Sequence, residues 1–148
     1  METTDRAKTG VQMKKFFLLL ITGFLLMVVG LGMSALVSSV EPSINVEYEN
    51  INIFRPWSDP LMSVYWAMPF VNAFLLIWLW NFTKSLIKGD SILKRGLTFG
   101  FFYWIITVPG LIMTYSTFQV SALIVISWSL SGLAQALCAG ILFSRTQP

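Results

Sequence analysis

KSLIKGDSILKRG, residues 84–96, holds five of the seventeen formally charged residues of the chain. The run that follows, from Gly96 to Ser144, holds none. About a quarter of the residues of a soluble domain are charged, whereas this chain of 148 residues is 11% charged and 55% hydrophobic. Too few side chains are polar enough to cover a globule in water. The sequence therefore predicts an integral membrane protein in which residues 84–96 form a polar turn between two apolar spans.

The apolar stretches of the chain are long enough to cross a bilayer. A hydrocarbon core about 30 Å thick requires about 20 apolar residues in a helical span. Four stretches reach this length, and the predicted spans are about 14–38, 61–84, 92–115 and 118–143. Little of the chain is left for a soluble domain. We therefore expect one domain, 1–148, of the all-α membrane class, with four transmembrane helices in an up-down antiparallel bundle.

The basic residues predict which way the chain is oriented. Short loops rich in lysine and arginine stay on the cytoplasmic side. Four such residues precede the first span, and four lie in the turn: Lys84, Lys88, Lys94 and Arg95. We expect both termini and this basic turn (84–96) to be cytoplasmic, in a bacterial-type plasma (inner) membrane. The same four residues are either a topology anchor at the lipid headgroups or a docking site for an acidic lipid or a partner.

The net charge of +3 follows from this topology, so a nucleic-acid partner is not expected. The first apolar stretch resembles a secretory signal in having two lysines before it and small residues after it. Its apolar core is longer than the roughly 7 to 15 residues of a signal peptide. We expect a retained helix, the alternative being a cleaved form with three spans.

Residues 39–60 (the 39–60 segment) form the longest polar stretch between spans and are expected on the outer side. Apolar and polar residues alternate here with a slip in phase, and the apolar members are Ile44, Val46, Ile51 and Ile53. Alternation with period two is typical of a strand, and a slip in phase is typical of a turn or bulge. The segment is therefore expected to be short and strand-like. It either covers the bundle as a lid or docks another protein.

Small residues predict where the helices pack. Lipid tails provide no hydrophobic drive for helix association, so close approach depends on glycine and alanine. Such residues recur at steps of four in the third and fourth spans, at Gly96, Gly100, Gly132, Ala136 and Gly140. The second span is bulky all round. We expect it to face lipid or another subunit.

Neutral polar and aromatic residues occur near the middle of three spans. Trp104 and Trp128 lie deep in their helices, and their indole N–H groups require acceptors. Asn72 or Gln135 can supply these acceptors if the helices converge there. This cluster is interpreted as packing and interhelical hydrogen bonding, with a solute path or a site for a flat lipophilic ligand as alternatives.

Residues typical of catalysis are scarce. The chain has no histidine and one cysteine, and every acidic residue lies outside the predicted spans. No catalytic constellation, metal site or cofactor is predicted, and a proton-coupled antiporter with an acid inside the membrane is disfavoured. We expect a non-catalytic accessory or interaction subunit that lies in the bilayer and assembles with other membrane proteins or with itself. The alternative is a small oligomeric channel or transporter for a polar or lipophilic solute.

Overall fold

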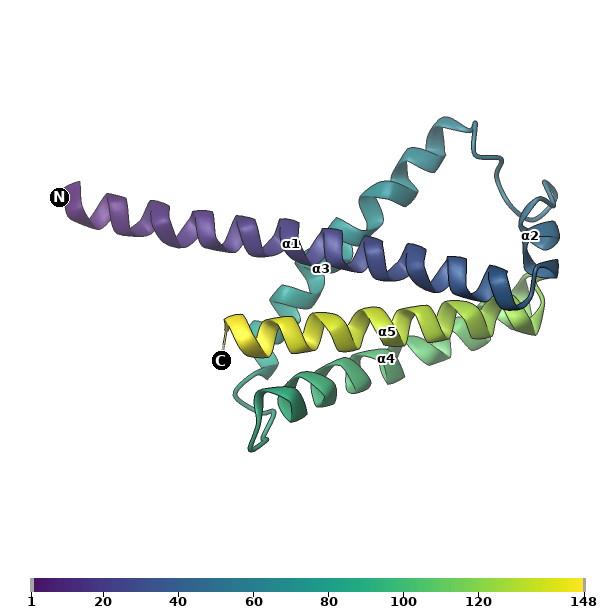
Figure 1. The fold of residues 1–148 in the computed structure, drawn as a ribbon. Helices are drawn as coiled ribbons and strands as arrows, with labels where there is room; N and C mark the ends of the chain where they lie inside the picture. The colour runs from purple at the N-terminus through teal and green to yellow at the C-terminus, as the bar shows by residue number, and fades with distance from the viewer. Residues whose placement is uncertain (1, 148) are drawn as a thin grey trace.

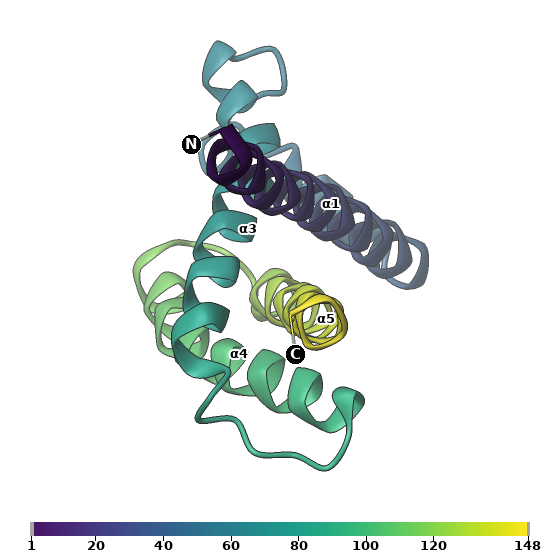
Figure 2. The same ribbon diagram turned by 90° about the vertical axis from the view of Figure 1, so that its left-hand side faces the viewer.

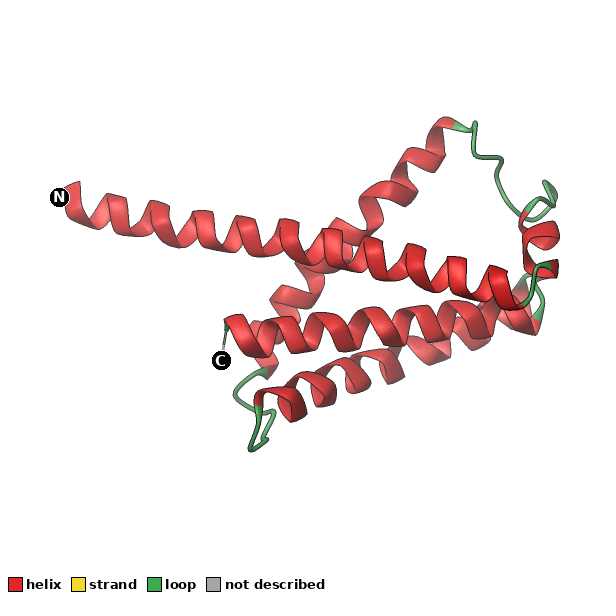
Figure 3. Cartoon of the chain, in the orientation of Figure 1, coloured by secondary structure: helices red, strands yellow, loops and turns green. Residues whose placement is uncertain are grey.

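The computed structural model describes residues 2–147, with side chains from Gln12 to Gln147. Its described residues form helices joined by turns and loops, with no strand among them (Figure 3). In chain order the elements are α1 (Glu2–Val40), α2 (Ser43–Tyr48), the 3-10 turn η1 (Pro60–Met62), α3 (Ser63–Thr83), α4 (Ile92–Thr117) and α5 (Ala122–Thr146). Four of these helices are long and apolar enough to cross a membrane, which confirms the predicted class of a four-helix membrane bundle.

The long helices alternate in direction, and three of them lie roughly alongside one another (Figure 1). α5 packs against both α1 and α4. α3 crosses the others steeply, and Figures 1 and 2 both show its first half leading away from α4 and α5. The up-down order is therefore as predicted, but α3 is not aligned with its neighbours.

Side-chain caps fix where the helices begin. The Ser91 hydroxyl accepts a hydrogen bond from the amide of Lys94 at 3.2 Å, and Ser121 does the same for Ile124 at 3.3 Å. The Asp59 carboxylate accepts from the amide of Leu61 at 2.9 Å. Each cap satisfies an amide that has no partner within its own helix. The polar residues between the spans thus set the helix boundaries.

α4 and α5 touch backbone to backbone at their glycines. A Cβ atom at Gly100 would lie 2.5 Å from the carbonyl oxygen of Ala136, and one at Gly96 would lie 2.7 Å from the Cα of Ile141. A Cβ atom at Gly140 would meet the carbonyl oxygen of Gly96. We call Gly96, Gly100, Ala136 and Gly140 the glycine seam. At its three glycines, only a hydrogen side chain allows this approach.

The main apolar core lies beside the glycine seam, toward the end of the bundle that carries the basic turn. Trp80 of α3 is fully buried there against Phe99 and Phe143, with ring centroids 5.2 and 6.1 Å away. Its indole N–H donates to the carbonyl of Gln147 at 3.2 Å. The second half of α3 is thus held firmly, although the whole helix was predicted to face lipid or a partner.

The strand-like prediction for the 39–60 segment is wrong. Residues Ser43–Tyr48 form the short helix α2, and turns follow it. Pro42 precedes the helix, where its fixed φ favours a helical start. Ile44 and Tyr48 are four apart and so share one face of a helix, whereas Val46 is 72% exposed. The apolar residues follow the helical period, and an isolated strand pair would have lacked support.

Candidate functional site

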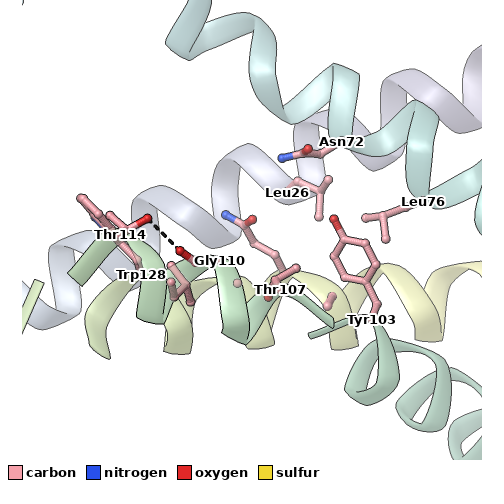
Figure 4. A pocket seen from close by; sticks show the side chains of 12 residues that line it. Leu26, Asn72, Leu76, Tyr103, Thr107, Gly110, Thr114 and Trp128 are labelled. Carbon is pink, nitrogen blue, oxygen red and sulfur yellow. Dashed lines mark hydrogen bonds between the residues drawn. The ribbon is translucent and has the colours of Figure 1, made fainter. Parts of the chain in front are cut away.

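A cavity of about 420 Å³ lies among α1, α3, α4 and α5 (Figure 4). One lining residue from each helix, Leu26, Asn72, Tyr103 and Gln135, is close to the middle of its span. The cavity therefore lies at about the midplane of the predicted bilayer. A volume of this size is in the range of small-molecule sites.

The polar lining of the cavity is neutral. It consists of two amides, one phenol and two hydroxyls, from Asn72, Gln135, Tyr103, Thr107 and Thr114. The remaining walls are aliphatic, aromatic or glycine, and none of the lining residues is charged. The cavity can therefore provide hydrogen bonds but no ion pair.

The polar groups differ in how far the protein satisfies them. Thr107 and Thr114 donate to carbonyls of their own helix, those of Trp104 at 2.7 Å and Gly110 at 2.9 Å. Among the described residues, no hydrogen bond uses the amides of Asn72 and Gln135 or the hydroxyl of Tyr103, and these atoms are not sealed off within the protein. Their hydrogen-bonding capacity is thus directed to the cavity.

Two glycines open the space, and a third makes room for an amide. Gly110 and Gly132 line the cavity, and an added Cβ at either would meet nothing within 4 Å. At Gly30 of α1, an added Cβ would meet the Gln135 amide. Gly132 was predicted to pack with Ala136 and Gly140. It instead faces the open space of the cavity.

The predicted cluster of polar and aromatic residues comes together only in part. Asn72, Trp128 and Gln135 line the same cavity. Trp104 does not, and its N–H donates to the carbonyl and hydroxyl oxygens of Ser129 at 3.0 and 3.1 Å. The N–H of Trp128 donates to the Tyr48 hydroxyl at 2.8 Å. The prediction that Asn72 or Gln135 accepts from these tryptophans is therefore wrong, because nearer acceptors exist.

Sequence reasoning missed Tyr103, Thr107 and Thr114. The signal was present, since Tyr103, Thr107, Gly110 and Thr114 are spaced by three or four residues and so share one face of a helix. Figure 4 shows the Tyr103 hydroxyl pointing toward Leu26 and Asn72 across the cavity. A stripe of small and polar residues on an apolar helix is thus the pattern that marks this wall.

The 39–60 segment is attached to the start of α5. The Glu47 carboxylate accepts a hydrogen bond from the amide of Ser121, with 2.6 Å between the two atoms. It therefore helps to cap the N-terminus of α5. Burial raises the pKa of Tyr48, whose hydroxyl accepts a hydrogen bond from the indole N–H of Trp128. Ile44 is 2% exposed and packs with Val120 and Ile124.

The four apolar residues predicted for docking therefore fall into two pairs, one packed and one exposed. Ile44 and Ile53 belong to the cluster on α5, whereas Val46 and Ile51 are 72% and 76% exposed. The segment covers its own bundle with one face and leaves the other free.

The basic turn holds its charges near the surface. Lys94 lies 3.5 Å from the Asp90 carboxylate, while Lys88 is exposed. Arg95 lies over the Trp80 ring, 5.8 Å from its centroid, and donates to the carbonyl of Lys84 at 3.4 Å. A second cavity, of about 460 Å³, lies beside this turn between Asp90 and Arg145. Arg95 thus has a packing role that the other three residues lack.

Among residues with described side chains, no three groups that commonly bind metals come together. No family model, curated protein or solved structure matches the chain. Its function is therefore inferred from its own geometry.

Proposed function

We propose that this protein is a non-catalytic accessory subunit of a membrane assembly, and that it binds its partner through the first half of α3. The observation that carries the proposal is the contrast within this helix. Its buried residues, Ala73, Leu76 and Trp80, all lie in the second half. From Ser63 to Asn72 no residue is buried.

The first half of α3 presents large side chains to its surroundings. Trp57, Tyr65 and Trp66 form an aromatic group at its start, with ring centroids 5.5 to 6.4 Å apart. Its contact with α1 includes Phe70, which packs at Gly23 and against the Phe24 ring at 5.3 Å. The other large side chains of this half remain about half exposed among the residues with described side chains.

Transmembrane helices associate through close packing rather than through a hydrophobic drive. A bulky helix that diverges from its own bundle gains this packing when a partner helix fits against it. Aromatic knobs require holes, so the partner expected here is a transmembrane helix of another protein with glycine, alanine or serine on its contact face. This arrangement supports an accessory subunit over an isolated monomer.

The proposal includes a location. The basic turn and the basic residues before α1 favour a plasma (inner) membrane with both termini in the cytoplasm. This topology leaves the start of α3 and the 39–60 segment on the outer side. The absence of histidine and the single cysteine support a role without catalysis.

Photo-crosslinking in native membranes tests the docking face. Benzoylphenylalanine in place of Trp66 is expected to give one discrete product with another membrane protein. The same group in place of Ile106, which is 72% exposed on α4, is the matched control and should give only lipid adducts. Lipid adducts alone at both positions would contradict the proposal.

A second candidate, a small oligomeric channel or transporter, is favoured by the neutral cavity near mid-membrane. Two differently tagged copies distinguish it from the accessory role. Crosslinks between the copies through position 66, together with solute flux in liposomes of the pure protein, would favour the second candidate.

A further inference from the structure

We infer that the cavity among α1, α3, α4 and α5 binds a neutral lipophilic molecule whose carbonyl or hydroxyl oxygens pair with Asn72 and Gln135. The chemical class is an uncharged lipid-soluble compound with oxygens on a ring or headgroup, such as a quinone or a diacylglycerol. The cavity is enclosed by residues of this chain's own four helices, so this site does not require the partner proposed for α3.

The position of the cavity selects the ligand class first. Asn72 and Gln135 lie close to the middle of their spans, so half a span of about 12 residues, or about 18 Å, separates them from either surface. A charged headgroup at this depth would lose its hydration. The lining offers it no opposite charge. The depth and the neutral walls together favour a molecule that is soluble in hydrocarbon.

The free donor and acceptor groups in the cavity favour a ligand that carries oxygen atoms. Each amide of Asn72 and Gln135 offers both a donor and an acceptor, and the Tyr103 hydroxyl offers both as well. None of the three bonds another described residue. A polar group left unpaired in a medium without water is unfavourable. A carbonyl or hydroxyl oxygen seated among them would satisfy these groups, which a plain acyl chain cannot do.

The remaining walls suit a flat or apolar body. Trp128 and Tyr103 contribute aromatic rings, and Leu26 and Leu76 contribute aliphatic surface. Gly110, which is exposed on α4, also lines the cavity, so this wall reaches the surface of the molecule within the span. Missing side chains at Gly110 and Gly132 leave room for entry from the lipid.

The purified protein in neutral detergent is titrated with decylubiquinone, a benzoquinone with a short alkyl tail that quenches tryptophan fluorescence. Saturable quenching is expected for the wild type. Asn72→Leu and Gln135→Leu are each expected to weaken binding at least tenfold. Gly132→Phe, which fills the cavity without removing a polar group, should abolish the saturable component.

Two controls match these changes in chemistry and in helical context. Asn81→Leu is the same substitution in α3, at a residue whose amide bonds the carbonyl of Ile77 at 3.0 Å outside the cavity. Gly32→Phe adds the same ring on α1, where nothing lies within 4 Å. Both variants should bind decylubiquinone as the wild type does. If Asn72→Leu does not fold, Gln135→Leu and Gly132→Phe decide the question.

Competition with dioctanoylglycerol, which does not quench, separates the two sources of oxygen. Displacement of the quinone shows a site for neutral oxygenated lipids in general, and lack of displacement shows a site restricted to ring compounds. Quenching that never saturates overturns the inference, as do equal affinities in the wild type, Gln135→Leu and Gly132→Phe.

Discussion

The glycine seam and the first half of α3 differ in the size of their side chains and in how closely they pack against their neighbours. Along the seam, Gly96 and Gly100 let α4 touch the backbone of α5. In the first half of α3, Tyr65 and Trp66 are about half exposed, and no residue there is buried. Both regions belong to helices that are apolar enough to cross a membrane. The difference shows that hydrophobicity places a helix in the membrane and that side-chain size decides what it touches.

The cavity lies where these two kinds of packing meet. The glycine seam ends at Ala136, and the next small residue on that face of α5, Gly132, lines the cavity instead. α3 lies away from α4 and α5 in its first half and reaches the other side of the cavity at Asn72 (Figure 1). The space is therefore a consequence of one tight and one loose helix contact.

The largest expected effect separates the two halves of α3. Trp80→Ala should lower the free energy of unfolding by about 3 to 5 kcal/mol, because a fully buried ring is lost and a void remains. Trp66→Ala, at a position that is 47% exposed, should change it by about 0.5 kcal/mol or less. Unfolding of the pure protein in mixed micelles with increasing SDS measures both. Similar losses would mean that the first half of α3 is packed as tightly as the second.

The next effect tests the glycine seam. Gly100→Leu places a side chain against the Ala136 carbonyl and should destabilise the bundle by about 3 kcal/mol, since backbone cannot yield as a side chain can. Gly32→Leu is the matched control, because nothing lies within 4 Å of its Cβ position. The same SDS titration applies. A Gly100→Leu protein as stable as Gly32→Leu would show that α4 and α5 are not in backbone contact.

A smaller effect concerns the attachment of the 39–60 segment. Glu47→Ala removes the acceptor for the Ser121 amide and should cost about 1 kcal/mol, as for other helix caps. Glu49→Ala, an exposed carboxylate two residues further on, should cost almost nothing. Cleavage of the segment by an added protease should be faster for Glu47→Ala only. Equal cleavage rates in the two variants would argue against the cap.

The smallest effect depends on pH. The Leu61 amide first, and Arg55 second, hold the pKa of Asp59 below its usual range. A carboxyl with a lowered folded-state pKa contributes stability above its unfolded pKa of about 3.9, and this is lost as the pH falls through the folded value. Melting between pH 5 and pH 3 should therefore drop more for the wild type than for Asp59→Asn, which keeps an acceptor but does not titrate. Parallel curves would exclude this contribution.

The sequence predicted what depends on composition and length. The four helical spans and their order followed from apolar runs about as long as the bilayer is thick, and the contacts of Gly96, Gly100 and Gly140 fit the small-residue spacing. The steep crossing of α3 was not predictable, because it depends on how bulky faces fit in three dimensions. The burial of Trp80 was missed for the same reason, because α3 has large side chains on all of its faces.

Local pattern misled where tertiary contact decides the outcome. Ile44, Val46 and Tyr48 alternate like a strand, yet α5 provides a surface that a helical turn fits, and Ile44 packs there. Asn72, Trp128 and Gln135, three members of the predicted cluster, line the same cavity. Their predicted hydrogen bonds were wrong, because Trp128 donates to Tyr48 and Trp104 donates to Ser129, which lie closer than the two amides.

The attachment of Glu47 to Ser121 also has a consequence for synthesis of the chain. The two residues are 74 positions apart, and Tyr48 is 80 positions from Trp128. At a translation rate of about 5 to 20 residues per second, α2 waits about 4 to 15 s for the residue it caps. During that time Ile44 lacks its buried partners Val120 and Ile124, and α1 lacks α5, one of the two long helices that pack against it. α5 is thus the element whose arrival completes the protein, and any factor that shields α2 has only those seconds in which to act.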